Sequence, residues 1–177
     1  MRRVAALLKG VNVGGNRKLP MADLRRLLVD LGHADATTLL ASGNAVFASD
    51  EEAPALEARL EREAKARLGL DTAILIRDAA DLDALVAGNP HADAVRARPQ
   101  HVIAMFLRDE VEPALLVALA AAYDGPERLA PVGRELVIDY VAGVGDSKLD
   151  AAMRKLKFPK AATARNWNTV LKLRALL

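Results

Sequence analysis

Short apolar runs alternate with stretches of helical periodicity along the first half of the chain. An apolar run too short for a helix indicates a buried strand, and apolar positions that recur every three or four residues indicate a helix with one buried face. The predicted order is a strand at 4–8, a helix at 20–31, strands at 37–41 and 45–48, a helix at 54–68 and a strand at 72–76. This order is that of a ferredoxin-like α/β sandwich.

The second half repeats this order with one element missing. A short helix at 78–87 precedes residues 89–100, whose prolines and lack of pattern predict a linker between a first unit (1–88) and a second (101–177). Beyond it, the pattern predicts a strand at 101–107, a helix at 113–122, a hairpin of strands at 129–132 and 135–140, a helix at 147–156 and a last helix from about residue 166. That last helix stands where a sixth strand is expected.

We therefore predict an α+β fold of two ferredoxin-like units with an extra C-terminal helix. The repeat is one of architecture, because the two halves share no evident residue-level similarity. The missing strand leaves two arrangements open: units that stand apart, and intertwined units that share a strand or exchange elements.

The composition is compatible with this fold and bears on the expected location of the protein. The chain has 177 residues, 52% of them hydrophobic, and no apolar run approaches the roughly 18 residues of a membrane span. The apolar run near the N-terminus is short and ends at Lys9, so we expect a first strand and no signal peptide. With no cysteine, disulfides and thiolate chemistry are excluded. We expect a cytoplasmic protein without a membrane partner.

The net charge of +2 conceals a segregation of charge along the chain. Residues 1–20 carry a net charge of +5 and residues 148–177 a net charge of +7, so the middle of the chain carries −10. If the fold brings the two ends together, they form a basic face. The alternative is two solvated charged ends that never meet.

Three ordered motifs resemble those of a known family. They are Lys9-Gly10-Val11-Asn12-Val13-Gly14-Gly15, Ser42-Gly43-Asn44-Ala45-Val46-Phe47 and Thr163-Ala164-Arg165-Asn166-Trp167-Asn168-Thr169. They are similar to Arg-Gly-Ile-Asn-Val-Gly-Gly, Ser-Gly-Asn-Val-Val-Phe and Thr-x-Arg-Asn-Trp-Asn-Thr of the bacterial domain of unknown function 1697 (DUF1697). The resemblance implies a ferredoxin-like fold of two units and no particular reaction. Lys9 replaces the family's arginine and so lacks its planar fork for bidentate anion contacts.

The first motif begins a glycine-rich loop with a weak anion-binding pattern. It is not a P-loop, because Asn16 and Arg17 stand where that motif needs Lys and Ser or Thr, and it does not match the dinucleotide fingerprint. Its backbone N–H groups can still turn outward toward an anion. The basic and polar candidates beside it are Lys9, Asn12, Arg17 and Lys18. Alternatively, the glycines only permit a long turn with positive φ.

Two further polar stretches have both a structural and a ligand-binding interpretation. Ser42 and Asn44 flank Gly43, where they form a tight turn or a bulge, or present a hydroxyl and an amide to a ligand. Ser147 has the capping-box spacing to Asp150 and so predicts a helix start. Lys148 in the first turn beside it would favour a phosphate or carboxylate. The two roles are compatible.

The third motif contains the chain's only tryptophan. In one interpretation Asn166 caps the last helix while Trp167, Val170 and Leu171 face the core. In the other, Trp167 stacks on a ligand ring while Arg165 and Asn168 contact its polar edge. Arg165 is also a candidate anion contact, because it lies in the most basic part of the chain.

No pattern identifies a metal site, a cofactor or a catalytic pair. His33, His91 and His101 lack ligand-like spacing, and no acid/base pair or activated nucleophile is evident, so enzymatic activity stays an open question. The first-ranked function is binding of a small anion between the first loop and the third motif. The alternatives are a structural lock between two units and, less favoured because the first strand has no aromatic residue, nucleic-acid binding through a basic face. Oligomeric state does not follow from the pattern.

Overall fold

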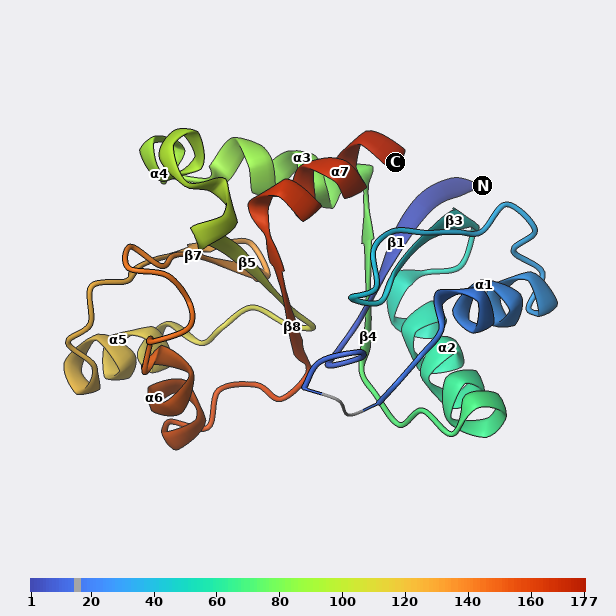
Figure 1. Ribbon diagram of the computed structural model, residues 1–177, viewed down its shortest axis with the longest axis horizontal. Helices are drawn as coiled ribbons and strands as arrows, with labels where there is room; N and C mark the ends of the chain where they lie inside the picture. The colour runs from blue at the N-terminus through green and yellow to red at the C-terminus, as the bar shows by residue number, and fades with distance from the viewer. Residues whose placement is uncertain (15–16) are drawn as a thin grey trace. The chain divides into compact units, whose positions relative to one another are not determined.

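The computed structural model describes residues 1–14 and 17–177 and divides into two compact units (Figure 1). The first unit contains Met1–Asp83 together with Lys172–Leu177, and the second contains Ala84–Leu171. Gly15 and Asn16, which belong to the loop of the anion-binding prediction, lie outside the described residues.

The first unit is built on a four-stranded antiparallel sheet of order β2-β3-β1-β4. Its elements are β1 (Arg2–Leu8), α1 (Met21–Asp30), β2 (Thr37–Thr38), β3 (Asn44–Ser49), α2 (Ala53–Leu68) and β4 (Ile74–Asp78). This confirms the predicted order of the first half. The shifts are local: β2 is shorter than expected, and Pro20 is the residue before α1 and not its first helical residue.

Helices α1 and α2 cover one face of this sheet (Figure 1). Alternate residues of the central strand, Val4, Ala6 and Leu8, enter one apolar cluster with the leucines of both helices, as strand alternation requires. Helix α2 also covers the edge strand β4, because Glu57 and Glu61 accept hydrogen bonds from backbone N–H groups of that strand, at 2.8 and 2.9 Å. Because these N–H groups are already bonded, the edge strand cannot use them to pair with another strand.

The second unit has a sheet of the same kind, with order β6-β7-β5-β8. Its elements are α3 (Ala79–Gly88, which begins in the first unit), α4 (Ala92–Ala97), the 3₁₀ turn Pro99–His101, β5 (Val102–Leu107), α5 (Pro113–Ala122), β6 (Arg128–Val132), β7 (Glu135–Asp139), α6 (Leu149–Lys155), β8 (Ala162–Asn166) and α7 (Trp167–Leu176), whose last residues belong to the first unit. The residues predicted as a linker thus include a short helix and a turn. Both sheets are compatible with ferredoxin-like units.

Strand β8 corrects the prediction that a sixth strand is missing. Its sequence, Ala-Thr-Ala-Arg-Asn, has no apolar run, so hydrophobic pattern alone does not reveal it. Pairing with β5 at five positions, from Ile103 with Asn166 to Leu107 with Ala162, makes it a strand. In the described part of the chain, each sheet therefore draws its four strands from one half of the sequence and no strand is shared, so intertwining of the two units is not confirmed.

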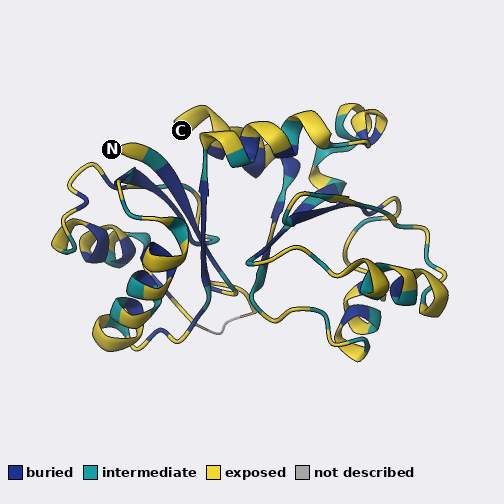
Figure 2. Cartoon of the chain, turned by 180° about the vertical axis from the view of Figure 1, so that it is seen from behind, coloured by how far each residue is buried: buried dark blue, intermediate teal, exposed yellow. Residues whose placement is uncertain are grey.

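The second unit is less completely covered by its helices than the first. The predicted helix at 147–156 is shorter in the structure, as α6 has seven residues, whereas α2 has 16. Helix α5 buries only Leu119, and in Figure 2 α5 and α6 show mainly exposed and half-buried surface. In the described part of the chain, no helix is long and apolar enough to cross a membrane.

Candidate functional site

The side chain of Asn12 holds the glycine-rich loop after β1 in place. The Asn12 Nδ2 donates to the carbonyl oxygens of Leu19 (2.9 Å) and Ala41 (2.7 Å), and its Oδ1 accepts from the backbone N–H of Leu19 at 2.8 Å. Asn12 itself has a φ of 56°, which asparagine tolerates better than most residues. Its amide group therefore ties the loop to the first residues before α1 and to the turn before β3.

The second motif packs directly against the first. Gly43 has a φ of 76°, and a Cβ there would lie 2.3 Å from a methyl group of Val11 and 2.9 Å from the Cβ of Leu8, so only glycine fits. Asn44 is fully buried, and its Nδ2 donates to the carbonyl of Leu39 at 2.8 Å and to the Ser42 hydroxyl at 3.0 Å. The polar groups of this motif are thus engaged within the turn.

The basic residues of the first loop differ in exposure. Lys9 is half-buried, and its carbonyl accepts from the Thr72 hydroxyl at 2.5 Å. Arg17 and Lys18 are exposed at the surface of the first unit. These two side chains are the ones that an anion in solution would reach first.

In the third motif, Arg165 is bonded to its own strand. Its side chain is 6% exposed, and its Nη1 donates to the Thr163 hydroxyl and the Ala164 carbonyl, both at 2.8 Å. Burial lowers the pKa of Arg165 to about 10. The guanidinium stays charged at neutral pH and is held by groups of the strand itself.

The rest of the third motif starts α7. The Asn166 Oδ1 accepts from the backbone N–H and the hydroxyl of Thr169, at 3.0 and 3.1 Å, which is the N-cap interaction predicted for it. Trp167 is 2% exposed, whereas Asn168 is exposed. Leu171 is 41% exposed, so the prediction that it faces the core is wrong. Leu173 is buried in its place, because the buried stripe of α7 runs at three-residue steps from Trp167.

Strand β4, the last strand of the first unit, ends in the same way as β8. Arg77 of β4 is 1% exposed, and its Nη1 donates to the carbonyl of the preceding residue, Ile76, at 2.8 Å, as Arg165 does. The next residue, Asp78, accepts from the N–H three positions on at 3.0 Å, as Asn166 does. Sequence analysis missed Arg77. The signal that identifies it is an arginine followed by a capping Asp or Asn at the end of the last strand of each unit.

Ser147 and Lys148 lie at the start of α6 but have different roles. The Ser147 hydroxyl accepts from the backbone N–H of Leu149 at 3.1 Å and donates to Glu127, which also accepts from the Tyr123 hydroxyl at 2.9 Å. Burial acts to raise the pKa of Glu127, but these hydrogen bonds outweigh it and lower that pKa. Lys148 is exposed and is the residue that precedes the helix. Ser147 thus links the start of α6 to Glu127, the residue before β6.

A cavity of about 210 Å³ lies on the helix-covered side of the second sheet. Its lining is mostly apolar and includes Ile103 and Met105 of β5 with Ala162 and Ala164 of β8. Val144 lines the mouth and is 48% exposed, so the cavity opens to solvent. Ligand pockets for drug-sized molecules occupy about 300–1,000 Å³, so this cavity suits a smaller molecule.

The origin of the cavity is visible when the two sheets are compared by register. On the helix-covered face the paired residues are Ala6 with Ile76 and Leu8 with Ile74 in the first unit, and Met105 with Ala164 and Leu107 with Ala162 in the second. Two isoleucines of the edge strand are thus replaced by two alanines. Because α6 is also shorter than α2, neither side chains nor helix fill the space above β8.

Four polar residues line this apolar space, and one of them, Thr163, is engaged by Arg165. Asn166 and Tyr140 line it, and neither the Nδ2 of Asn166 nor the hydroxyl of Tyr140 has a hydrogen-bond partner among the described residues. The exposed carboxylate of Asp150 lies at its edge. Burial raises the pKa of Tyr140, and the charges of Asp150 and Glu127 raise it further, so the phenol is neutral at physiological pH.

A separate ionic cluster holds α4 and the following turn against the sheet. The fully buried Asp139 accepts from Arg98 at 2.7 and 3.2 Å and from Arg128 at 2.9 Å, and Arg128 also reaches Asp93 at 2.8 Å. Burial acts to raise the pKa of Asp139, but these hydrogen bonds lower it. His91 beside them is 7% exposed. The two arginines of the cluster are engaged with carboxylates that hold structure, whereas the buried His91 Nε2 has no hydrogen-bond partner among the described residues.

The twelve sequence-predicted residues fall into two sets. Those in the first unit are Lys9, Asn12, Arg17, Lys18, Ser42 and Asn44, and those in the second are Ser147, Lys148, Arg165, Asn166, Trp167 and Asn168. Each set is described within its own unit, and a joint basic site of the two sets stays a prediction. Of the second set, only Asn166 lines the cavity. Among the described residues, no group of three or more His, Asp or Glu side chains is placed to hold a metal ion.

Fold and cavity together define a class: a mixed α+β protein of two four-stranded antiparallel sheets, one of which carries a small open cavity. The chain belongs to the family described as "Protein of unknown function (DUF1697)", whose model matches residues 1–136. The first two motifs lie within that match, and the third lies beyond it.

A solved structure resembles the whole chain. It is that of the conserved bacterial protein SP0830 from Streptococcus pneumoniae, with 22% sequence identity, a TM-score of 0.72 and coverage of 99% of this chain and 98% of the other. At this identity the likeness supports the fold alone. Comparison with curated proteins found no match.

Proposed function

We propose that this protein binds a small molecule in the cavity of its second unit. The observation that carries the proposal is an apolar space bordered by two polar groups, the Tyr140 hydroxyl and the Asn166 Nδ2, that have no partner among the described residues. In an open cavity, polar groups without a protein partner are free to bond to water or to a ligand. An apolar pocket with a few convergent polar groups is the usual form of a ligand site.

The contacts of the three motifs support a structural role for most of their polar residues. Asn12, Asn44 and Arg165 donate to backbone carbonyls of their own unit, and Asn166 caps α7 through its oxygen. Such bonds fix loops and helix ends. Asn166 combines both roles, because the cap uses its oxygen and leaves its Nδ2 for the cavity.

The test is binding of 2-phenylethanol, whose ring and single hydroxyl match the chemistry of the cavity. We expect binding to shift the methyl NMR signal of Met105. Ala164→Leu places a larger side chain in the lining of the cavity and is expected to weaken binding at least about tenfold, or roughly 1.4 kcal/mol. Ala151→Leu is the matched control, since Ala151 is exposed on α6 and does not line the cavity.

The proposal fails if 2-phenylethanol, 2-phenylethylamine and phenylacetate all leave the Met105 signal unchanged. It fails equally if Ala164→Leu and Ala151→Leu bind the probe as the parent does.

The anion-binding prediction is tested by a separate arm of the same experiment. Inorganic phosphate is the probe, and the exposed pair Arg17 and Lys18 are replaced together by alanine. Loss of a phosphate-induced rise in melting temperature in this variant would support an anion site at the first loop. If phosphate does not raise the melting temperature of the parent protein, the anion-binding prediction is wrong.

A further inference from the structure

The charged side chain in the lining of the cavity is an acid. Of the residues that line it, only Asp150 is charged at neutral pH, and neither lysine, arginine nor histidine is among them. The Glu127 carboxylate is close enough to act on Tyr140 as Asp150 does. These two carboxylates favour a cation in the cavity, although the buried Arg165 guanidinium lies close by, where it donates to the Thr163 hydroxyl and the Ala164 carbonyl.

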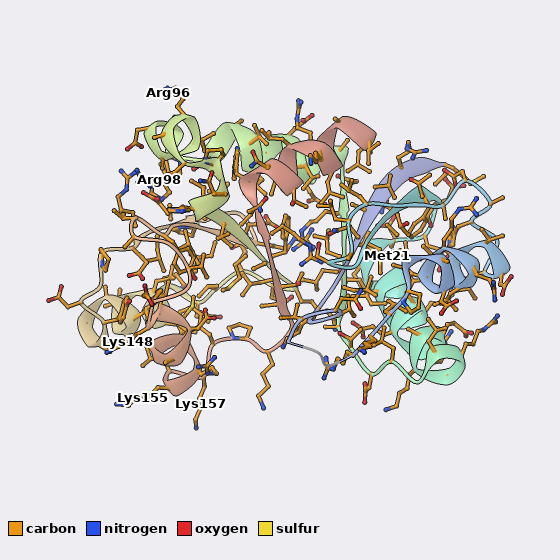
Figure 3. All side chains as sticks on the ribbon, in the orientation of Figure 1. Met21, Arg96, Arg98, Lys148, Lys155 and Lys157 are labelled. Atoms are coloured by element: carbon orange, nitrogen blue, oxygen red, sulfur yellow. The ribbon has the colours of Figure 1, made fainter. Side chains whose placement is uncertain are left out.

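The Asp150 carboxylate is available to a ligand. It lies in the first turn of α6, is exposed, and makes no ion pair with any residue in the described ranges. Two nearby cations, Lys155 at the end of α6 and Lys157 just beyond it, extend outward and not toward β8 (Figure 3). A cationic group that enters the mouth of the cavity therefore finds a carboxylate without a competing partner.

The remaining polar groups suit a donor with several hydrogens. An ammonium group has three donor hydrogens and no acceptor. The oxygens of Asp150 and Tyr140, two residues of the lining, supply acceptors, and the apolar residues Ile103, Met105 and Ala164 supply a surface for a hydrocarbon body. A carboxylate or phosphate would instead meet Asp150 as a like charge, which disfavours it.

We infer that the ligand of this cavity is a small primary amine with an apolar body, an inference that rests on the proposed function. Its ammonium group pairs with Asp150 and donates a second hydrogen bond to the Tyr140 oxygen. Its body lies on Met105 and Ala164, which the short α6 leaves uncovered.

The experiment compares three probes with the same ring and different heads: 2-phenylethylamine, 2-phenylethanol and phenylacetate. Because Asp150 is exposed, its pairing with the amine is expected to add only about two- to fivefold in affinity over the alcohol at low salt. Phenylacetate is expected to bind most weakly. In Asp150→Asn the amine and the alcohol should bind alike, whereas Asp146→Asn, at a neighbouring exposed acid outside the lining, should keep the preference.

The outcomes distinguish failure of the proposed function from failure of the amine inference. If amine and alcohol bind the parent equally and Ala164→Leu weakens both, the cavity is a binding site and the amine inference is overturned. A preference for the amine that persists in Asp150→Asn also overturns it. If no probe binds, the proposed function fails and the inference fails with it.

Discussion

At the scale of single residues, two buried groups of the second unit, His91 and Asp139, couple its stability to pH. Burial, together with the charge of Arg128, lowers the pKa of His91 below its ordinary value of 6.5, although Asp139 and Asp93 oppose this. The folded protein therefore holds this proton less tightly than the unfolded chain. Below about pH 6.5 the unfolded chain binds more protons, so the free energy of unfolding falls as the pH falls.

The first prediction follows for His91→Gln, which removes the titrating ring. Between about pH 7 and pH 5 the urea midpoint of the parent should fall more steeply than that of the variant. Asp139, with its lowered pKa, contributes a further loss at more acidic pH in both proteins. Equal slopes for parent and variant in the upper range would show that His91 does not contribute.

The two tyrosines offer a matched pair for a second prediction. Tyr123→Phe removes a hydrogen bond to the Glu127 carboxylate and is expected to lower the free energy of unfolding by about 1–2 kcal/mol. Tyr140→Phe removes a hydroxyl without a partner in the described ranges and should change it little. Urea unfolding of both variants measures the difference. A loss for Tyr140→Phe as large as for Tyr123→Phe would contradict the view that its hydroxyl is left for a ligand.

At the scale of elements, the last strand of each unit ends in the same way. β4 and β8 each end with a buried arginine, which donates to the carbonyl before it, and with a capping residue that starts the next helix. Arg77 pairs in register with Ala5 of the central strand, and Arg165 pairs with Ala104. The repeat, which the sequence pattern shows only in the order of elements, therefore has a residue-level signature at these two strand ends.

The third prediction concerns these two arginines. Arg77→Ala and Arg165→Ala each remove a buried guanidinium and leave buried acceptors without a donor, so each should lower the free energy of unfolding by about 2–4 kcal/mol. Arg26→Ala, at an exposed position of α1, is the control and should fall within about 0.5 kcal/mol of the parent. Denaturant unfolding compares the three. A loss at Arg165 alone would contradict the equivalence of the two strand ends.

At the scale of the whole molecule, the end of the chain returns to the first unit. Residues Lys172–Leu177 belong with Met1–Asp83, where the Arg3 Nε donates to the Leu176 carbonyl at 2.9 Å and Arg174 pairs with Asp83. The final turns of α7 are thus part of the structure that also contains β1. A substitution in these turns is therefore expected to destabilise the first sheet.

The fourth prediction uses two leucines of α7. Leu173 is fully buried, and Leu173→Ala should lower the free energy of unfolding by about 2–5 kcal/mol and speed hydrogen exchange in β1. Leu171 is 41% exposed, so Leu171→Ala should leave both nearly unchanged. Exchange measured by mass spectrometry reports the effect strand by strand. Protection of β1 that is unchanged in Leu173→Ala would contradict the assignment of this segment to the first unit.

Local signals in the sequence determined most of the helices and strands. The periodicity of leucines predicted α1 and α2, the boundaries of α5 match the prediction, and Asn166 caps α7 as expected. These features depend on neighbours within a few residues, so the order of residues contains the information. The family motifs likewise lie in the sequence itself.

Only the tertiary structure decided the features on which the proposals rest. β8 is a strand because β5 offers a partner for Ala162–Asn166, a contact between residues far apart along the chain. The cavity exists because a short helix and two alanines fail to fill a space that α2 and two isoleucines fill in the first unit. Such a difference in volume appears only when distant elements are packed together, and composition and periodicity do not contain it.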